Sequence, residues 1–294
     1  MLLVTGAAGH LGQSVLHHLI ATLGVPAGSI VAATRNPAKL AIWAAKGVST
    51  RQLDFEDAES LGAGFAGVSR ALLISTDAVD RPGRRLEQHV AAIAAMESAG
   101  VQHVVYTSMP RPENSPLLLA PDHEGSEKAL ANSNLPGWTV LRNHWYFENL
   151  FASLPSALAS GKWYSADEGG ASADISRDDL GRAAATVLAG DGQGRRILTL
   201  SGPQALTRAQ TVERLNAALG KAIEIVPVPL EALVQGGVAA GLPEPVARIY
   251  ASFDANTAAG RVAAVSDDFA RITGRAPQTF DAWLAVNKAA LAAL

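Results

Sequence analysis

Three glycines near the start of the chain give the clearest indication of a ligand-binding site. They are Gly6, Gly9 and Gly12, in the segment VTGAAGHLG of residues 4–12. The apolar run 1–4 predicts a short buried strand before them, and residues 11–23 predict an amphipathic helix after them. Glycines between a strand and a helix let the backbone turn sharply and approach a phosphate, which the free N–H groups and positive dipole end of the helix attract. The spacing is GxxGxxG rather than the GxGxxG of the standard dinucleotide fingerprint. The segment therefore predicts a pyrophosphate site, and the alternative is a glycine-rich turn that binds no ligand.

The residue after the second predicted strand indicates which dinucleotide binds. An NAD enzyme usually places an Asp or Glu there to hold the ribose hydroxyls, but residues 29–34 (SIVAAT) contain no acid and Arg35 follows directly. A guanidinium can bind a 2′-phosphate through two hydrogen bonds, and Lys39 adds positive charge one helical turn away. Such a charge-assisted pair contributes about 1.5–3 kcal/mol, or roughly ten- to a hundred-fold in affinity. The sequence therefore predicts NADPH as the cofactor, with a solvated surface arginine as the alternative for Arg35.

The first half of the chain alternates predicted strands and helices. Strands are expected over residues 1–4, 29–34, 48–53, 71–75, 104–107 and 139–142, and helices over 11–23, 37–46, 57–65, 84–99 and 123–132. Because several strands are wholly apolar, they predict a parallel sheet covered on both faces. The second half is less regular, with helices expected over 177–188, 244–258, 266–272 and 279–291, a helix from the capping box at 207–210 to Gly220, and strands over 197–200 and 224–228.

These elements predict an α/β fold with a Rossmann-type, doubly wound parallel sheet. We expect an NADP-binding domain over residues 1–150 and a smaller mixed α/β lobe over 151–294, with the strand near 197–200 rejoining the main sheet. Ligands of such sheets bind beyond the carboxyl ends of the strands. The cofactor-binding residues expected there are Gly6 to Gly12, Arg35, Lys39, Asp54, Phe55, Ser75, Thr76, Thr107, Ser108 and Asn143.

The composition excludes several classes of protein. The 294 residues are 48% hydrophobic and 17% charged, which predicts a sizeable core and little disorder. A net charge of −3 gives no electrostatic footprint for nucleic acid or an anionic membrane. The chain has no cysteine, so disulfides and thiolate chemistry are excluded. With no apolar run long enough to span a bilayer and no room for a signal peptide before the first strand, the expected location is the cytoplasm.

Five segments together resemble a known family: VTGAAGHLG (4–12), TRNPAK (34–39), LLIS (72–75), YTS (106–108) and LRNHWYFEN (141–149). The chain resembles the NmrA-like group of atypical short-chain dehydrogenases, within it first the type 2 NADPH:quinone oxidoreductases and next the triphenylmethane dye reductases. The likeness spans most of the chain and is strongest over residues 1–150. It implies an NADPH-binding Rossmann domain and a small C-terminal lobe that forms a substrate cleft. It also implies that the cofactor is lined by Gly6, Ala7, Ala8, Gly9, His10, Leu11, Arg35, Ser75, Thr76, Asp77 and residues 140–145.

The catalytic pair of ordinary short-chain dehydrogenases is incomplete in this chain. Those enzymes use a Tyr and a Lys four residues apart on a helix, but here Glu124 stands four residues before Lys128. Reduction of a simple ketone gives a basic alkoxide and benefits from a positioned acid, whereas a quinone gives a delocalised phenolate that water can protonate. A cationic dye needs no proton. The missing tyrosine therefore favours direct hydride transfer to a quinone or similar flat acceptor, with binding geometry supplying most of the acceleration.

Three residues are candidates for a catalytic role. Asn143 would hold the nicotinamide ribose or carboxamide. Tyr146 is a candidate hydroxyl donor within the aromatic run 145–147, of which at least two residues are expected to pack in the core. Lys128 either faces the cofactor ribose or pairs with Glu124 on the helix surface.

Two other groups of polar residues are expected to have no catalytic role. His123, at the start of its predicted helix, is expected to be a cap or surface group rather than a proton relay. No metal is expected at Asp174, Asp178 and Asp179, because no histidine lies nearby and Asp179 is explained by the helix start.

Three functions remain under consideration. The leading hypothesis is an NADPH-dependent reductase of a small aromatic or quinone acceptor, and the alternative is a non-catalytic NADP(H)-sensing regulator of the NmrA type. Sugar-nucleotide epimerisation ranks last because it normally relies on the missing tyrosine. The apolar helices leave the oligomeric state open, with a homodimer among the expectations.

Overall fold

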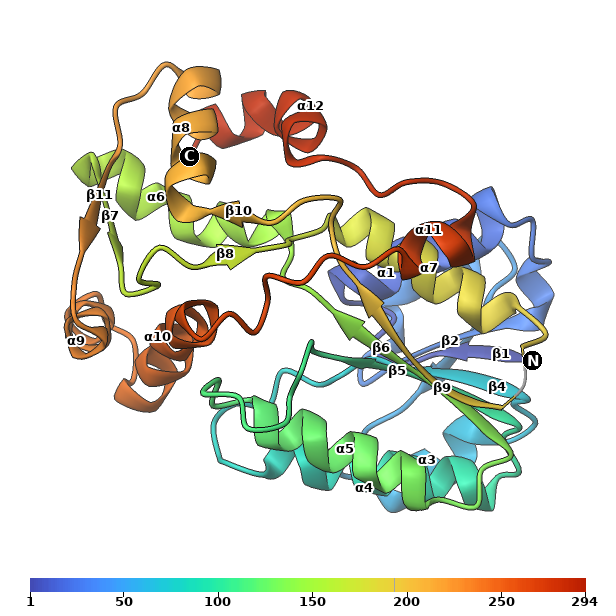
Figure 1. Cartoon of the computed structure of the whole chain (residues 1–294). Coiled ribbons are helices and arrows are strands. Elements are labelled where there is room, and N and C mark those ends of the chain that lie inside the picture. The colour runs from blue at the N-terminus through green and yellow to red at the C-terminus, as the bar shows by residue number, and fades with distance from the viewer. Residues whose placement is uncertain (193) are drawn as a thin grey trace.

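The computed structural model describes residues 1–192 and 194–294 and is built around a seven-stranded parallel sheet (Figure 1). Its strands run in the order β3-β2-β1-β4-β5-β6-β9. They are β1 (Leu2–Val4), β2 (Ile30–Thr34), β3 (Ser49–Gln52), β4 (Arg70–Leu73), β5 (His103–Ser108), β6 (Gly137–Asn143) and β9 (Arg195–Leu200). The order reverses between β1 and β4, the point at which doubly wound sheets bind ligands. The predicted Rossmann-type α/β fold is confirmed.

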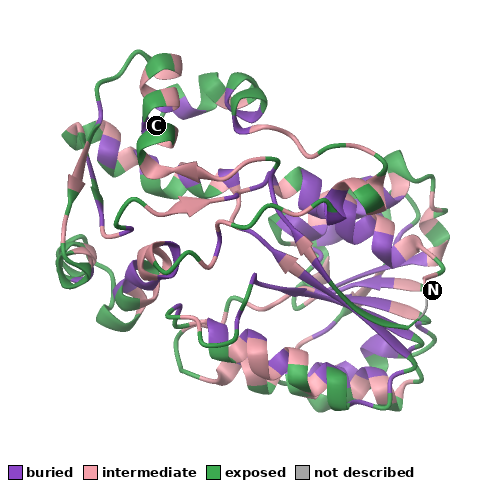
Figure 2. Ribbon diagram, in the orientation of Figure 1, coloured by how far each residue is buried: buried purple, intermediate pink, exposed green. Residues whose placement is uncertain are grey.

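The inner strands contribute side chains to two hydrophobic cores, because successive side chains point to opposite faces of the sheet. On β1, Val4 belongs to one core and Leu3 to the other, and on β5 Val105 and Val104 divide in the same way. The first face is covered by α1 (His10–His17), α7 (Arg177–Ala189) and α11 (Asp268–Thr273), and the second by α3 (Ala58–Phe65), α4 (Arg84–Ser98) and α5 (Ala120–Asn132). Figure 2 shows the sheet as the most continuous buried part of the chain.

The remaining elements form a smaller mixed α/β unit. Two short sheets lie in it: β7 (Lys162–Ser165) pairs in parallel with β11 (Glu224–Pro227), and β8 (Ala171–Ser172) pairs antiparallel with β10 (Leu206–Thr207). Its helices are α6 (Leu150–Ser160), α8 (Arg208–Leu219), α9 (Leu230–Ala239), α10 (Glu244–Ala258) and α12 (Phe280–Ala292). An aromatic core that includes Phe147, Trp163, Phe280 and Trp283 holds much of this unit together.

Several helices differ from the sequence expectation for local reasons. The helix expected over 11–23 is α-helical only to His17 and continues as a π-helical turn, His18–Thr22. That over 37–46 divides into a 3₁₀ turn, Pro37–Leu40, and the short α2 (Ala41–Ala44). Helices α6 and α9 were not expected. An internal proline, Pro155, interrupts the helical signal of the first, and paired glycines over 236–237 weaken that of the second.

Elements beyond residue 150 return to the main sheet. Besides β9, helix α7 packs on it, and the Arg70 side chain of β4 donates to the carbonyls of Val187 and Leu188 at 3.1 and 2.8 Å. In addition, Asp268 of α11 accepts a 2.7 Å hydrogen bond from the N–H of Thr199 in β9. The sheet and the smaller unit are therefore interleaved along the chain.

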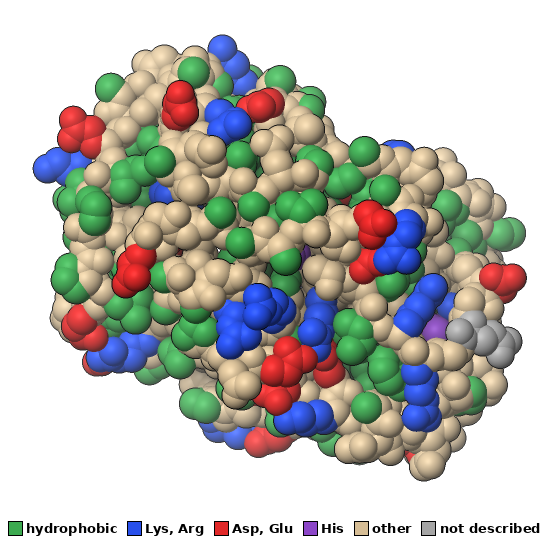
Figure 3. Space-filling model, viewed as in Figure 1, with side chains coloured by type: hydrophobic (Ala, Val, Ile, Leu, Met, Phe, Trp, Pro, Cys, Tyr) green, Lys and Arg blue, Asp and Glu red, His purple; other side chains and the backbone are tan. Residues whose placement is uncertain are grey.

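The hydropathy of the helices and the charges on one face of the molecule bear on its possible partners. Within residues 1–192 and 194–294, no helix has both the length and the apolar character needed to cross a bilayer. On the face seen in Figure 3, basic and acidic side chains lie next to one another near the middle of the molecule.

Candidate active site

The glycine turn after β1 folds tightly against the first turn of α1. Gly6 has a left-handed backbone (φ +57°), and its carbonyl accepts a 2.9 Å hydrogen bond from Gly9 N–H. A Cβ at Gly12 would lie 2.5 Å from the Gly6 oxygen and 2.7 Å from Ala7 Cα. Both distances are to backbone atoms, so no side chain fits at Gly12. The turn therefore has the close backbone packing that a pyrophosphate site needs.

The start of α1 is open to an anion. Gly9 is its N-cap, and among the described residues no side chain caps the helix. Gly6, Gly9 and His10 are exposed, whereas Leu11 and Ala7 enter the core and Ala8 is half-buried. The exposed backbone N–H groups and the helix dipole fit a phosphate group.

Two cations lie beyond β2. Arg35 directly follows the strand, and Lys39 lies in the 3₁₀ turn whose start is capped by Asn36; both cations are exposed. The nearby carboxylate of Glu56 is already held by Arg84, at 2.6 and 2.8 Å. Hydrogen bonds from Arg84 and Gln88 hold the pKa of Glu56 at about 2. Arg35 has no ion-pair partner within the described part of the chain and can meet an anionic ligand.

Hydroxyl groups tie the ends of neighbouring strands together. Thr5 Oγ1 accepts from Ile74 N–H and Thr107 Oγ1 accepts from Ser75 N–H, each at 2.9 Å. The N–H of the next residue, Thr76, donates to His89 at 3.1 Å. The loop after β4 is thus fixed at three consecutive N–H groups.

The other expected cofactor residues lie at neighbouring loop positions. Asp77, after β4, is exposed. Asp54 and Phe55 follow β3 and are half-buried, with the Asp54 carboxylate accepting from the N–H of Glu56.

Ser108, at the end of β5, lies in an ionic cluster. Its hydroxyl donates to Glu127 Oε1 at 2.6 Å, and Arg142 of β6 donates to Glu127 Oε2, also at 2.6 Å. Arg142 also pairs with Glu113. Sequence reasoning missed Glu127 because nothing in its local pattern distinguishes it from a solvated helix residue.

Lys128 and Glu124 pair on the surface of α5. Lys128 Nζ lies 2.6 Å from Glu124, and the Lys128 side chain is 70% exposed. Of the two roles considered for Lys128, the structure shows the surface ion pair.

The expectation that His123 is a cap or surface group is wrong. His123 is buried, and its Nε2 accepts from Arg85 at 3.1 Å while its Nδ1 lies 2.9 Å from the Tyr106 hydroxyl. Arg85 also donates to Ser75 at 2.5 Å. Burial and Arg85 lower the pKa of His123 well below its ordinary value. The helix begins three residues earlier than expected, at Ala120, so His123 lies within the helix rather than at its start.

Asn143 is the last residue of β6, and both it and the next residue, His144, are buried. Asn143 is 5% exposed, and its Oδ1 has no hydrogen-bond partner among the described residues. An unsatisfied buried amide oxygen costs about 1–3 kcal/mol unless a ligand or water pairs with it. Such an oxygen fits a nicotinamide carboxamide or ribose hydroxyl.

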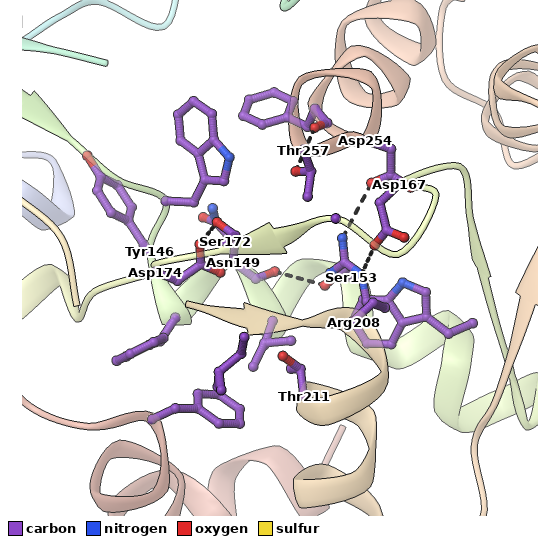
Figure 4. A pocket seen from close by; sticks show the side chains of 18 of the residues that line it. Tyr146, Asn149, Ser153, Asp167, Ser172, Asp174, Arg208, Thr211, Asp254 and Thr257 are labelled. Carbon is purple, nitrogen blue, oxygen red and sulfur yellow. Dashed lines mark hydrogen bonds and ion pairs between the residues drawn. The ribbon is translucent and has the colours of Figure 1, made fainter. Parts of the chain in front are cut away.

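A cavity of about 410 Å³ begins at the residues that follow β6 (Figure 4). Trp145, Tyr146 and Phe147 all line it, and each also packs against neighbouring apolar residues. Trp145 meets Phe253 edge-on at 4.9 Å between ring centroids, and Phe147 packs at 5.3 Å from Phe280. Burial raises the pKa of the Tyr146 phenol. These rings form flat, apolar walls suited to a conjugated molecule.

Polar groups form the far end of the cavity. The Arg208 guanidinium lies over the Trp163 ring at 5.0 Å and pairs with Asp167 at 3.3 Å and Asp254 at 3.4 Å. A third carboxyl of the cavity, that of Asp174, lies away from this end and nearer Tyr146 (Figure 4). Sequence reasoning missed Trp163, Arg208 and Asp254 because they come from three separate elements and share no local motif.

Comparisons with known proteins agree with this geometry. The profile of a family described as NAD(P)H-binding matches residues 6–191. Quinone oxidoreductase 2 of Escherichia coli is 36% identical over 279 residues, 95% of this chain and 96% of the relative. An NAD(P)H azoreductase of Xenophilus azovorans is 26% identical over 294 residues, 100% of both chains.

Solved structures give the same result. The NADPH complex of the Escherichia coli quinone oxidoreductase superposes with a TM-score of 0.91 at 35% identity, covering 97% of this chain and 99% of the other. Triphenylmethane reductase of Citrobacter sp., complexed with NADP(H), reaches 0.89 at 33% identity with the same coverage. Because the family match spans more than half of the chain and begins at the glycine turn, the protein belongs to the NAD(P)H-binding family.

Proposed function

We propose that this protein uses NADPH to reduce a quinone or a similar flat, conjugated acceptor. The observation that carries the proposal is the position of the aromatic cavity, which starts at Trp145 and Tyr146, directly after the carboxyl end of β6. In a doubly wound sheet the dinucleotide lies along that edge. An acceptor in the cavity is therefore next to the cofactor crevice.

The chain's own residues can hold NADPH, which when bound supplies a hydride. The glycine turn and the start of α1 would bind the pyrophosphate, and Arg35 with Lys39 would bind the 2′-phosphate. The loops after β3 and β4 would contact the adenosine, and Asn143 would orient the nicotinamide. The surface position of Lys128 supports no role for it in binding the ribose.

The cavity walls favour an acceptor that is flat and largely apolar. Aromatic side chains can stack on such a molecule and exclude water, and a cavity of about 410 Å³ accommodates more than one fused ring. By its position in the sequence Glu124 stands where ordinary short-chain dehydrogenases have the tyrosine, and it pairs with Lys128 on the surface of α5. An acceptor that forms a stabilised oxyanion suits this site better than a simple ketone.

The test is a panel of acceptors with the purified protein. NADPH oxidation is followed by its absorbance with benzoquinones, naphthoquinones, a nitroarene, an enone and a triphenylmethane dye. We expect turnover with quinones and a raised KM in Trp145→Leu. The matched control is Val286→Ala, at a highly exposed position on α12 outside the cavity. If the wild type binds NADPH but oxidises it with none of these acceptors, the reductase proposal is wrong and an NADP(H) sensor is favoured.

The proposed acceptor is a small molecule, and a homodimer is the proposed assembly. Light scattering at several protein concentrations tests the assembly, and a constant mass of one chain would reject it.

A further inference from the structure

Three carboxyl groups line the cavity, and two of them are neutralised. Asp167 and Asp254 both pair with Arg208. Asp254 also accepts from the Ser165 hydroxyl at 2.9 Å and from the N–H of Ala166 at 2.8 Å. Both groups therefore have a cationic partner within the cavity.

Asp174 differs from the other two. Across residues 1–192 and 194–294 it has no ion-pair partner, and its carboxyl accepts only from the Ser172 hydroxyl. Burial raises the pKa of Asp174, and the Ser172 hydrogen bond opposes that effect. A carboxyl in this state can hold a proton at higher pH than an exposed aspartate does.

The backbone fixes Asp174 next to the aromatic end of the cavity. Ile175, the next residue, donates its N–H to the Trp145 carbonyl at 3.0 Å and bridges to Tyr146. On the other side, Ala173 N–H donates to Val262 at 2.8 Å. A Cβ at Gly202 would lie 1.9 Å from the Asp174 carbonyl oxygen, so the chain is closely packed there. Figure 4 shows Asp174 near Tyr146, Asn149 and Ser172.

Of the groups around Asp174, Tyr146 also carries a proton near pH 7, but burial raises the pKa of its phenol above the ordinary value and makes it a weaker acid than a carboxyl. Arg208 on α8 lowers the pKa of Asp174 through its charge, but both of its ion pairs are with Asp167 and Asp254. His144, the residue directly after β6, is buried, which lowers its pKa to about 4, so it is neutral near pH 7.

We propose that Asp174 is the proton donor of this reductase, giving its carboxyl proton to the acceptor oxygen that gains negative charge. The inference rests on the proposed function, because it assigns a role within that same cavity. In this role Asp174 supplies the proton that a tyrosine supplies in ordinary short-chain dehydrogenases.

The step balances with the reactants already named. The quinone accepts a hydride, which is one proton with two electrons, from NADPH, which becomes NADP⁺. The quinone is thereby converted to the hydroquinone anion. The Asp174 O–H bond breaks, and an O–H bond forms at the anionic oxygen. The resulting Asp174 carboxylate regains a proton from water that reaches the cavity. Reduction of a triphenylmethane cation requires hydride alone and bypasses this step.

The test compares the two kinds of acceptor in Asp174→Asn, which keeps the size of the side chain and removes the proton. We expect kcat for quinone to fall about 100-fold, the lower range for general acid catalysis, and kcat for the dye to stay near the wild-type value. The matched control is Asp178→Asn, an exposed carboxylate on the same segment that pairs with His18 outside the cavity; it should leave both rates unchanged. Equal rates in wild type and Asp174→Asn with quinone, or equal losses with both acceptors, would overturn the proposal.

Two further measurements test the role of Asp174 without using the dye. In wild type the quinone rate should fall as the pH rises through the pKa of Asp174. The fall should shift to higher pH in Ser172→Ala and disappear in Asp174→Asn. Infrared difference spectra without NADPH should show a protonated carboxyl band that Asp174→Asn removes; absence of that band in wild type at pH 6 overturns the proposal. A wild type inactive with every quinone instead rejects the proposed function.

Discussion

At the scale of single residues, Gly12 tolerates the least change in the cofactor crevice. The space a side chain would need is filled by backbone atoms of the Gly6–Ala7 turn, which cannot rotate away as the end of a flexible side chain can. This requirement could be predicted from the glycine spacing. The unpaired state of Asp174 could not, because it depends on where Arg208 places its two ion pairs.

Replacing Gly12 by alanine tests whether the tight turn itself, rather than the loss of any glycine, affects stability and NADPH binding. We expect Gly12→Ala to lower the free energy of unfolding by about 1–3 kcal/mol, the range for overpacking, and to weaken NADPH binding at least tenfold. Thermal unfolding and NADPH fluorescence titration measure the two effects. Gly28→Ala is the control, because nothing lies within 4 Å of its added Cβ. Equal behaviour of the two variants would contradict the tight turn.

Arg35 should determine the choice between the two nicotinamide dinucleotides. A guanidinium paired with a 2′-phosphate contributes about 1.5–3 kcal/mol, so Arg35→Ala should reduce the preference for NADPH over NADH roughly ten- to a hundred-fold. The ratio of the two dissociation constants is the measurement. Arg81→Ala, which removes an exposed arginine paired with Glu87, serves as the control. An unchanged ratio in Arg35→Ala would show that Arg35 is an ordinary surface residue.

At the scale of elements, α4, α5 and β5 meet through a buried polar network. His89 of α4 accepts from Thr76 N–H through Nε2, so its Nδ1 carries the proton and donates to Ser126 Oγ at 2.8 Å. The existence of these elements could be predicted from their apolar periodicity. The network could not, because it depends on how α4 and α5 pack against each other and against the sheet, which no local pattern of residues shows.

Buried neutral histidines should make the fold sensitive to acid. Burial lowers the pKa of His89 to about 3, and of His103 and His144 to about 4, whereas an unfolded histidine has a pKa near 6.5. Above pH 6.5 both states are neutral and nothing is lost. Below it the unfolded state binds protons that the folded state cannot, so stability falls with decreasing pH. Each histidine should lower the free energy of unfolding by up to about 2 kcal/mol between pH 6.5 and pH 5.

Urea unfolding at a series of pH values measures this slope. His89→Gln should make the slope shallower, and His10→Gln, at an exposed position, should leave it unchanged. A free energy of unfolding that stays constant from pH 7 to pH 5 would contradict the neutral burial of these rings.

At the scale of the whole molecule, the sheet could be predicted and the cavity could not. Alternating strands and helices predict the parallel sheet and the edge at which ligands bind. The cavity is lined by Trp145, Trp163, Arg208 and Phe280, which lie up to 135 residues apart in the chain. No local pattern brings such residues together, because their meeting depends on how the smaller unit packs.

The interleaving of the two units limits how this architecture can be rearranged. After leaving the sheet at β6 the chain returns for α7 and β9, leaves again, and returns for α11, with the Arg70 hydrogen bonds anchoring the first return. A chimera that exchanged everything after residue 150 would also exchange the outer strand and two supporting helices. The range of acceptors is therefore best changed by single substitutions in the cavity wall. For the same reason, relatives of this architecture should diverge by substitution rather than by exchange of long segments.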